Sequence, residues 1–159
     1  MDATAMYQIQ FLMSANVGEA LKPIQKVASG GELARIMLAL KNVLAEDDGI
    51  GSLVFDEVDT GVSGRAAQKV AEKMSDVARH KQVLCVTHLP QIAAMAHTHF
   101  SVQKGERDGR TFTRVEHLDR AGREDELARL LGGANVTDTL RESAKELLNY
   151  AAAYHNASK

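Results

Sequence analysis

The sequence predicts an α/β protein with a largely parallel sheet flanked by helices. Short apolar segments typical of buried strands alternate along the chain with segments of helical periodicity, and this order is typical of α/β folds. The chain has 159 residues, of which 45% are hydrophobic, and this length suits one domain with its own core. We therefore expect residues 1–159 to form a single domain.

Five segments predict the first elements of this fold. Residues 7–13 alternate apolar and polar side chains before becoming apolar, which predicts a strand. Residues 31–46 carry apolar side chains at spacings of three and four, which predicts an amphipathic helix. The apolar segments 53–55 and 82–87 predict two buried strands of the parallel sheet, and the helical segment 66–79 connects them.

The remaining residues predict a C-terminal β-hairpin and helices. Pro90 opens a short helix that extends to residue 95. Two alternating segments flank Asp108-Gly109, a pair that favours a tight hairpin turn. Two helical segments follow, and Gly132-Gly133 closes the first of them. The hairpin strands and these helices are predicted at residues 100–103, 111–117, 124–131 and 137–154.

Two acidic residues, Asp56 and Glu57, come directly after the first predicted buried strand. In parallel sheets, ligands bind at the carboxyl ends of the strands. A carboxylate held there can orient a magnesium ion, and its neighbour can polarise an attacking water. The alternative is that both acids only close the strand and cap the next helix.

Ser29-Gly30-Gly31-Glu32 opens the first predicted helix and also allows two interpretations. Glycines at a helix N-terminus let a phosphate approach free backbone N–H groups. The spacing of Ser29 and Glu32 equally matches a capping box, which would be purely structural. Two consecutive glycines are more than a cap requires, because they weaken a helix unless close backbone approach matters.

Thr87-His88 ends the second predicted buried strand. A neutral imidazole at this position can contact a terminal phosphate. A histidine that merely lies in a polar loop is the simpler interpretation of His88 taken alone.

Taken together, these motifs resemble the C-terminal half of an ABC-type ATPase head. Ser29 to Glu32 resembles the ABC signature, Leu53 to Glu57 resembles the Walker B strand with its catalytic glutamate, and His88 resembles the switch histidine. Val58 to Ser63 stands where the family has its D-loop, with Ser63 in place of the usual aspartate. Longer segments resemble the C-terminal head segment of the RecN family of bacterial SMC-like DNA repair proteins, namely Lys26–Leu33, Phe55–Gly64, Val86–Gln91 and Glu126–Gly133.

This resemblance, which runs from about Tyr7 to Leu148, implies the C-terminal lobe of an SMC/ABC-type P-loop ATPase head. Such heads bind ATP and Mg²⁺ and hydrolyse ATP between two paired heads. By resemblance, Asp56 lies on the magnesium, Glu57 activates water and His88 contacts the γ-phosphate. The other residues that the resemblance assigns to nucleotide binding are Ser29, Gly30, Gly31, Glu32, Asp59 and Ser63.

The sequence contains no P-loop, because no G-x-x-x-x-G-K-[ST] motif occurs and no Gly is followed by Lys. In the RecN family the P-loop lies near the N-terminus, beyond a long coiled coil. We therefore expect the isolated chain to be inactive. Its implied partners are the N-terminal P-loop half of the same protein, a second head in a homodimer, and DNA through the full-length protein. The implied location is the bacterial cytoplasm, with no membrane contact.

Composition and the missing P-loop keep other functions open. The chain has 19 basic and 21 acidic residues and no Trp, so composition does not support direct DNA binding by its own surface. One alternative is a self-sufficient TOPRIM-like metal-dependent phosphotransferase or nuclease that uses Asp56, Glu57 and Asp59. Another is a non-catalytic docking module whose helix at residues 137–154 binds a partner.

Overall fold

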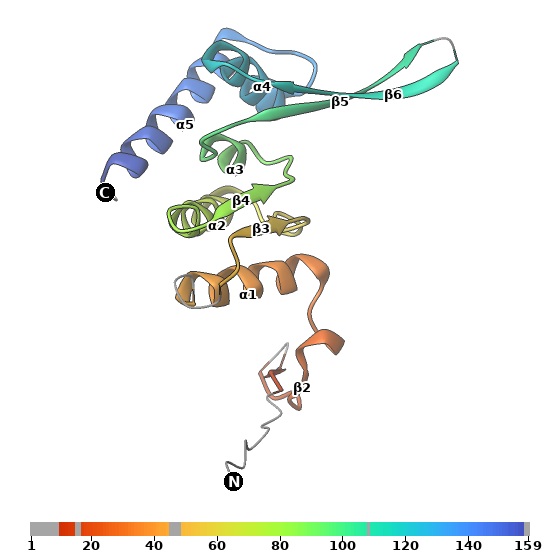
Figure 1. Ribbon diagram of the computed structural model, residues 1–159, viewed down its shortest axis with the longest axis vertical. Coiled ribbons are helices and arrows are strands. Elements are labelled where there is room, and N and C mark those ends of the chain that lie inside the picture. The colour runs from red at the N-terminus through yellow and green to blue at the C-terminus, as the bar shows by residue number, and fades with distance from the viewer. Residues whose placement is uncertain (1–9, 15–16, 45–48, 108, 158–159) are drawn as a thin grey trace.

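The computed structural model describes residues 10–14, 17–44, 49–107 and 109–157, and it contains helices, a parallel strand pair and a projecting hairpin (Figure 1). Two short N-terminal strands pair antiparallel, the next two strands alternate with helices, and the last two strands follow one another as a hairpin. In chain order the elements are β1 (Leu12–Met13), β2 (Lys22–Pro23), the 3-10 turn Ile24–Lys26, α1 (Gly30–Val43), β3 (Ser52–Phe55), α2 (Gly64–Val77), β4 (Gln82–Cys85), α3 (Pro90–Ala94), β5 (Phe100–Arg107), β6 (Arg110–His117), α4 (Arg120–Gly132) and α5 (Asp138–Ala157).

The predicted parallel strands are confirmed as the pair β3–β4, with Ser52 opposite Gln82 and Phe55 opposite Cys85. Helix α2 provides the crossover between them, as parallel strands require. The sheet is smaller than predicted, however. Among the described residues, each of the three sheets has two strands, and only β3–β4 is parallel.

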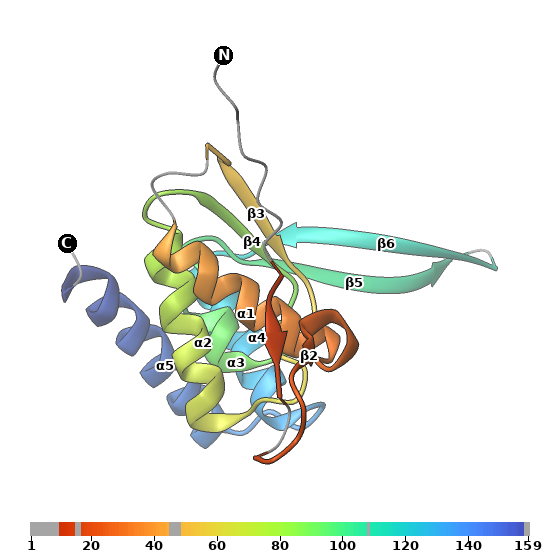
Figure 2. The same cartoon turned by 90° about the horizontal axis from the view of Figure 1, so that it is seen from below.

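The prediction that both strands are buried is only half correct. Leu53, Phe55, Val83 and Cys85 face the helices and contribute to the core. On the opposite face, Val54 is 71% exposed, Leu84 is 49% exposed and Val86 is 65% exposed. The reason is visible in Figure 2, where α1 and α2 lie on one side of the β3–β4 pair. An apolar side chain in a strand is buried only where a second layer covers it.

The core consists of two clusters that meet at the short helix α3. Ile92 and Met95 pack into the cluster formed by α1, α2 and β3, whereas Ala93 and Ala94 pack into the cluster formed by α4 and α5. Pro90 opens this helix as predicted, because its missing N–H group is not needed at a first helical turn. Helix α3 therefore fixes the position of the C-terminal helices relative to the parallel strands.

The predicted hairpin is confirmed, and its strands are longer than the sequence indicated. β5 and β6 pair over eight residues each, and they extend away from the helices (Figure 2). Gly105 lies opposite Phe112, whose ring covers it so closely that a Cβ at position 105 would lie 2.5 Å from the ring. Gly109 of the expected turn has φ +70°, whereas Asp108 and the expected strand residues 7–9 lie outside the described residues.

Several helix ends differ from the predictions for identifiable reasons. α4 begins at Arg120 instead of Glu124, because Asp119 acts as its N-cap and accepts a hydrogen bond from the Gly122 N–H. α4 ends at Gly132, and Gly133 follows with φ +69°.

His97 and His99, which alternate as strand residues would, lie in the loop before β5. Within the described part of the chain, no helix is long and apolar enough to cross a membrane.

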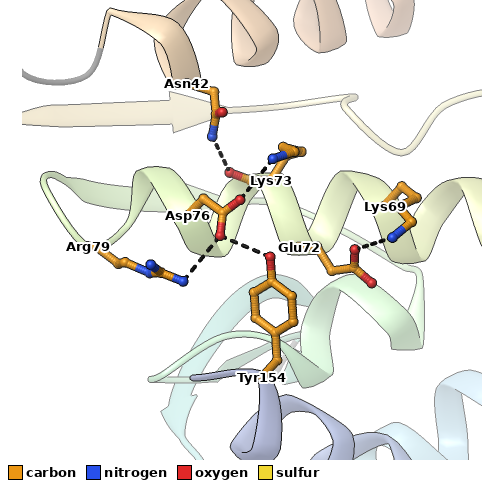
Figure 3. Close-up of polar contacts among 7 residues, drawn as sticks. All are labelled: Asn42, Lys69, Glu72, Lys73, Asp76, Arg79 and Tyr154. Carbon is orange, nitrogen blue, oxygen red and sulfur yellow. Dashed lines mark hydrogen bonds and ion pairs between the residues drawn. The ribbon is translucent and has the colours of Figure 1, made fainter. Parts of the chain in front are cut away.

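Polar side chains hold α2 between α1 and α5 (Figure 3). The Asn42 side-chain amide donates to the Lys73 carbonyl, which ties α1 to α2. The Tyr154 hydroxyl donates to Asp76 at 2.9 Å, and the Tyr150 hydroxyl donates to Glu72 at 2.8 Å, which tie α5 to α2. Because α2 begins directly after residues 56–63, these contacts also fix one end of that loop.

We predict that Tyr154→Phe lowers the free energy of unfolding by about 1 kcal/mol at neutral pH, through loss of the hydrogen bond to Asp76. Burial and the Asp76 carboxylate raise the pKa of Tyr154 from 10.0 to about 12. In the unfolded chain Tyr154 ionises near its ordinary pKa, so its contribution is complete below about pH 10 and is lost by about pH 12. Denaturant unfolding between pH 8 and 12 should therefore show a smaller alkaline loss in the variant. Identical pH dependence in both proteins would contradict this assignment.

Candidate active site

The predicted functional residues gather where β3 and β4 end. Because the two strands are parallel, Asp56-Glu57 and Thr87-His88 leave the sheet at the same edge. The Val86 N–H still bonds to the Phe55 carbonyl at 3.0 Å, and beyond it the chain turns away from the ladder. β4 is thus two residues shorter than predicted, because Thr87 and His88 bond to a side chain of the neighbouring loop.

That side chain is Asp59, which joins the two loops. Its Oδ2 atom accepts from the Thr87 hydroxyl at 2.6 Å and from the His88 backbone N–H at 3.0 Å, and it lies 3.1 Å from His88 Nδ1. Asp59 is only 4% exposed. Burial alone would raise the pKa of Asp59, but these hydrogen bonds and the nearby His88 ring outweigh burial and hold the pKa below its ordinary value.

The capping box predicted for Ser29 and Glu32 is confirmed. The Ser29 hydroxyl accepts from the Glu32 N–H at 3.3 Å, and the Glu32 carboxylate accepts from the Ser29 N–H at 2.8 Å. The backbone and hydroxyl of Ser29 lower the pKa of Glu32. Both residues are exposed, so the capping function of Ser29 leaves its side chain accessible from outside the chain.

The two glycines of this motif lie close to the chain's own loop. A Cβ on Gly31 would lie 2.7 Å from the Thr60 carbonyl oxygen and 3.0 Å from that of Glu57. A Cβ on Gly30 would lie 2.7 Å from Glu57 Oε2. The close backbone approach that sequence analysis attributed to a phosphate is therefore made, in this structure, by residues 57–60.

Arg35 strengthens the same contact, and the sequence analysis missed it. Its guanidinium donates to the Thr60 carbonyl at 2.7 Å and to the Val58 carbonyl at 3.2 Å. The available signal was its position one helical turn after Gly31, which places Arg35 and Gly31 on the same side of α1. The N-terminal turn of α1 is thus attached to the loop that carries Glu57 and Asp59.

Glu57 has an unusual backbone conformation. Its φ is +58°, and among the described residues it is the only non-glycine residue with positive φ. Such a conformation costs on the order of 1 kcal/mol and persists only where the surrounding contacts impose it. The Glu57 N–H donates to the Asp56 carboxylate at 2.9 Å, and both side chains are exposed. The turn therefore directs the Glu57 carboxylate outward and toward Gly30.

Asp56 fits one magnesium ligand and no more. In the part of the chain that the structure describes, no group of three or more His, Cys, Asp or Glu side chains is placed to hold a metal ion. A magnesium ion at Asp56 would take its other ligands from phosphate oxygens and water, which is its usual coordination at nucleotide sites. The three-acid site of the TOPRIM-like alternative is disfavoured because Asp59 is buried against Thr87 and His88.

Two further residues complete the site. Ser63 is the exposed N-cap residue of α2, and its side chain makes no capping hydrogen bond. Cys85 lies on β4 just before this edge, and burial together with Asp59 and Asp56 raises the pKa of its thiol to about 12. The thiol is therefore protonated at neutral pH.

Sequence comparison relates the chain to bacterial DNA repair proteins. It is 52% identical over 143 residues to the DNA repair protein RecN of Bacillus subtilis, 50% over 143 residues to that of Halalkalibacterium halodurans, and 49% over 146 residues to that of Deinococcus radiodurans. These matches cover 90%, 90% and 92% of this chain but 25% of each relative. The chain is therefore similar to RecN, and it spans about a quarter of the length of these relatives. No protein-family profile matches it.

A solved structure shows the fold. Its chain superposes with a TM-score of 0.51 and 22% identity, covering 74% of this chain and 70% of the other. That structure comes from work on the ATP-driven dimerization and DNA-stimulated activation of SMC ATPases. The chain therefore shares the fold of this SMC ATPase structure, as the sequence predicted.

We predict that Gly31→Ala and Gly30→Ala differ sharply in stability although the residues are adjacent. Gly31→Ala should lower the free energy of unfolding by about 1–3 kcal/mol, because its Cβ meets a backbone carbonyl that cannot move away alone. Gly30→Ala should be close to neutral, because the flexible Glu57 side chain can turn aside. Denaturant unfolding of both variants measures this difference. A Gly31→Ala variant as stable as the wild type would show that the approach to residues 57–60 does not require Gly31.

Proposed function

We propose that this chain is the C-terminal lobe of a RecN-type ATPase head that acts in DNA repair. The observation that carries the proposal is the identity of about one half to RecN over nearly the whole chain. The candidate residues also lie together at the carboxyl ends of two parallel strands, where such a site is expected. ATP hydrolysis, head pairing and DNA handling would belong to the longer protein in the bacterial cytoplasm.

In this proposal the two acids after β3 have separate roles. Asp56 holds the magnesium side of the nucleotide through its exposed carboxylate. Glu57 accepts a proton from the attacking water, and its positive φ sets the direction in which its side chain leaves the backbone. When bound, Mg²⁺ neutralises charge on the phosphates. His88, at the end of β4, contacts the γ-phosphate or the water that attacks it.

The start of α1 would serve the nucleotide of a second, identical head. Ser29 and Gly30 are exposed at a helix N-terminus, where free N–H groups and the helix dipole favour an anion. Ser63 lies exposed at the N-cap of α2 and is available to the same interface. Glu32 supports this surface from within the chain by completing the cap of α1.

The uncovered face of β3–β4 supports docking of the P-loop half of the same protein. Val54, Leu84 and Val86 present a continuous apolar surface that the helices of this chain leave exposed. Among the described residues, β4 pairs on one side only, with β3. Exposed apolar strand surfaces of this kind are typical of interfaces. A further strand from the P-loop half would pair with the second edge of β4. A covering layer from the same half would bury the exposed apolar face.

We predict that the isolated chain does not bind Mg·ATP in a calorimetric titration, because the P-loop is absent. Addition of a purified P-loop-bearing N-terminal segment of Bacillus subtilis RecN should restore ATP binding and turnover. In this mixture, Glu57→Gln should retain ATP binding but slow turnover by about 10²-fold or more. Glu116→Gln makes the same chemical change on the exposed hairpin strand and should leave turnover unchanged.

Three outcomes would contradict this assignment. Tight ATP binding by the chain alone would indicate a complete phosphate site within it. Tight Mg²⁺ binding without nucleotide would favour the TOPRIM-like alternative. Normal turnover of Glu57→Gln in the mixture would remove Glu57 from the mechanism.

We also predict that Ser29→Arg blocks ATP-dependent head pairing while sparing ATP binding to a single head. The bulky cation would occupy the exposed N-terminus of α1, where the nucleotide of the second head is expected. Ser29→Thr keeps a capping hydroxyl and should pair normally. Sedimentation of the reconstituted heads with a non-hydrolysable ATP analogue measures pairing. Normal pairing of Ser29→Arg would restrict Ser29 to its role in the capping box.

A further inference from the structure

We propose that Asp59 is a positioning residue that fixes the ring of His88 through Nδ1 and so determines that Nε2 is the atom His88 presents to the nucleotide. This inference rests on the proposed ATPase function and assigns Asp59 an indirect role. The sequence analysis placed Asp59 among the nucleotide-binding residues. Its carboxylate is instead occupied by groups of its own chain.

Two hydrogen-bond donors and one imidazole nitrogen converge on a single oxygen atom of Asp59. The Thr87 hydroxyl, the His88 N–H and the His88 Nδ1 all lie within 3.1 Å of Asp59 Oδ2. The Thr87 hydroxyl in turn accepts from the Leu89 N–H at 3.1 Å. One carboxylate oxygen therefore holds Thr87 and His88 directly, and it holds Leu89 through the Thr87 hydroxyl. Surface contacts made by chance do not usually converge in this way.

The second support is the contrast in burial within the pair. The Asp59 side chain is 4% exposed, whereas the His88 side chain is 74% exposed. A carboxylate is retained in a buried position only where several donors satisfy it. By contrast, an exposed imidazole can adopt several rotamers and either tautomer unless a partner restricts it. The buried member of the pair thus constrains the accessible one.

The chemistry of imidazole gives this constraint a direction. His88 Nδ1 lies 3.1 Å from Asp59 Oδ2, and because a carboxylate only accepts hydrogen bonds, a hydrogen bond across this contact would require the proton on Nδ1. In the neutral ring the second nitrogen, Nε2, then carries a lone pair and no proton. Neutral His88 would therefore accept a hydrogen bond from a water molecule at the site. Contact with an anionic phosphate oxygen would require the protonated ring, whose positive charge Asp59 balances.

The position of Asp59 in the loop also connects His88 to the start of α1. Asp59 lies between Val58 and Thr60, whose carbonyls accept from Arg35. Gly31 packs against the Thr60 carbonyl on the same segment. A displacement of the N-terminal turn of α1 would therefore move the residue that orients His88. The N-terminal turn of α1, which is proposed to meet a second head, is therefore connected to His88 through these contacts.

The test begins with the tautomer of His88 in the purified chain, measured by long-range ¹H–¹⁵N NMR of the imidazole rings. We expect the Nδ1–H form in the wild type and a shift toward the Nε2–H form in Asp59→Ala. Asp59→Asn keeps an acceptor oxygen and should retain the Nδ1–H form. His117 on the exposed hairpin should be the same in all three proteins. An Nε2–H ring at His88 in the wild type overturns the proposal even where Asp59→Ala does not fold.

The second measurement uses the mixture with the P-loop-bearing segment. We expect Asp59→Ala and His88→Ala each to lower kcat by about 10²-fold with little change in the KM for ATP. The double variant should be no slower than His88→Ala, because residues that act as a unit are not additive. Additive losses would show that Asp59 acts independently of His88 and would overturn the proposal. A wild-type mixture without ATPase activity would instead contradict the proposed function and leave the tautomer result unaffected.

Discussion

The close approach between the N-terminal turn of α1 and the loop at residues 57–60 is the constraint on which the site depends. Only a glycine at position 31 allows the Thr60 carbonyl to lie where it does, and Arg35 then bonds the same carbonyl from one turn further along α1. With this loop held, Glu57 adopts its positive φ and Asp59 points inward to Thr87 and His88. A motif that resembles a phosphate-binding element is therefore also an internal packing element, and the two roles are compatible because Ser29 and Gly30 stay exposed.

The molecule is well packed on one side of its parallel strands and open on the other. Helix α3 contributes to both core clusters, and the tyrosines of α5 bond to carboxylates of α2, so the helical side forms a continuous layer. Val54, Leu84 and Val86 have no such layer. This asymmetry agrees with a chain that spans about a quarter of the length of its RecN relatives.

Sequence analysis located most elements and misjudged features that depend on distant residues. The hairpin was predicted because alternation and a turn pair are local signals, and its extension past residue 103 was missed because Gly105 interrupts the alternation. The start of α4 was placed too late, because the capping action of Asp119 shows only in the hydrogen bond to Gly122. The burial of both strand faces was predicted from apolar residue type, which cannot report whether a second layer exists.

The sequence by itself determined the order of elements, the capping box at Ser29 and the residues that follow each parallel strand, because these depend on short-range periodicity and spacing. Only the tertiary structure decided that the glycine pair accommodates residues 57–60 and that Arg35 secures that loop. It also decided that Asp59 faces His88 instead of solvent. The physical reason is that each of these contacts joins residues at least 23 positions apart, and the identity of one partner carries no local signal of the other.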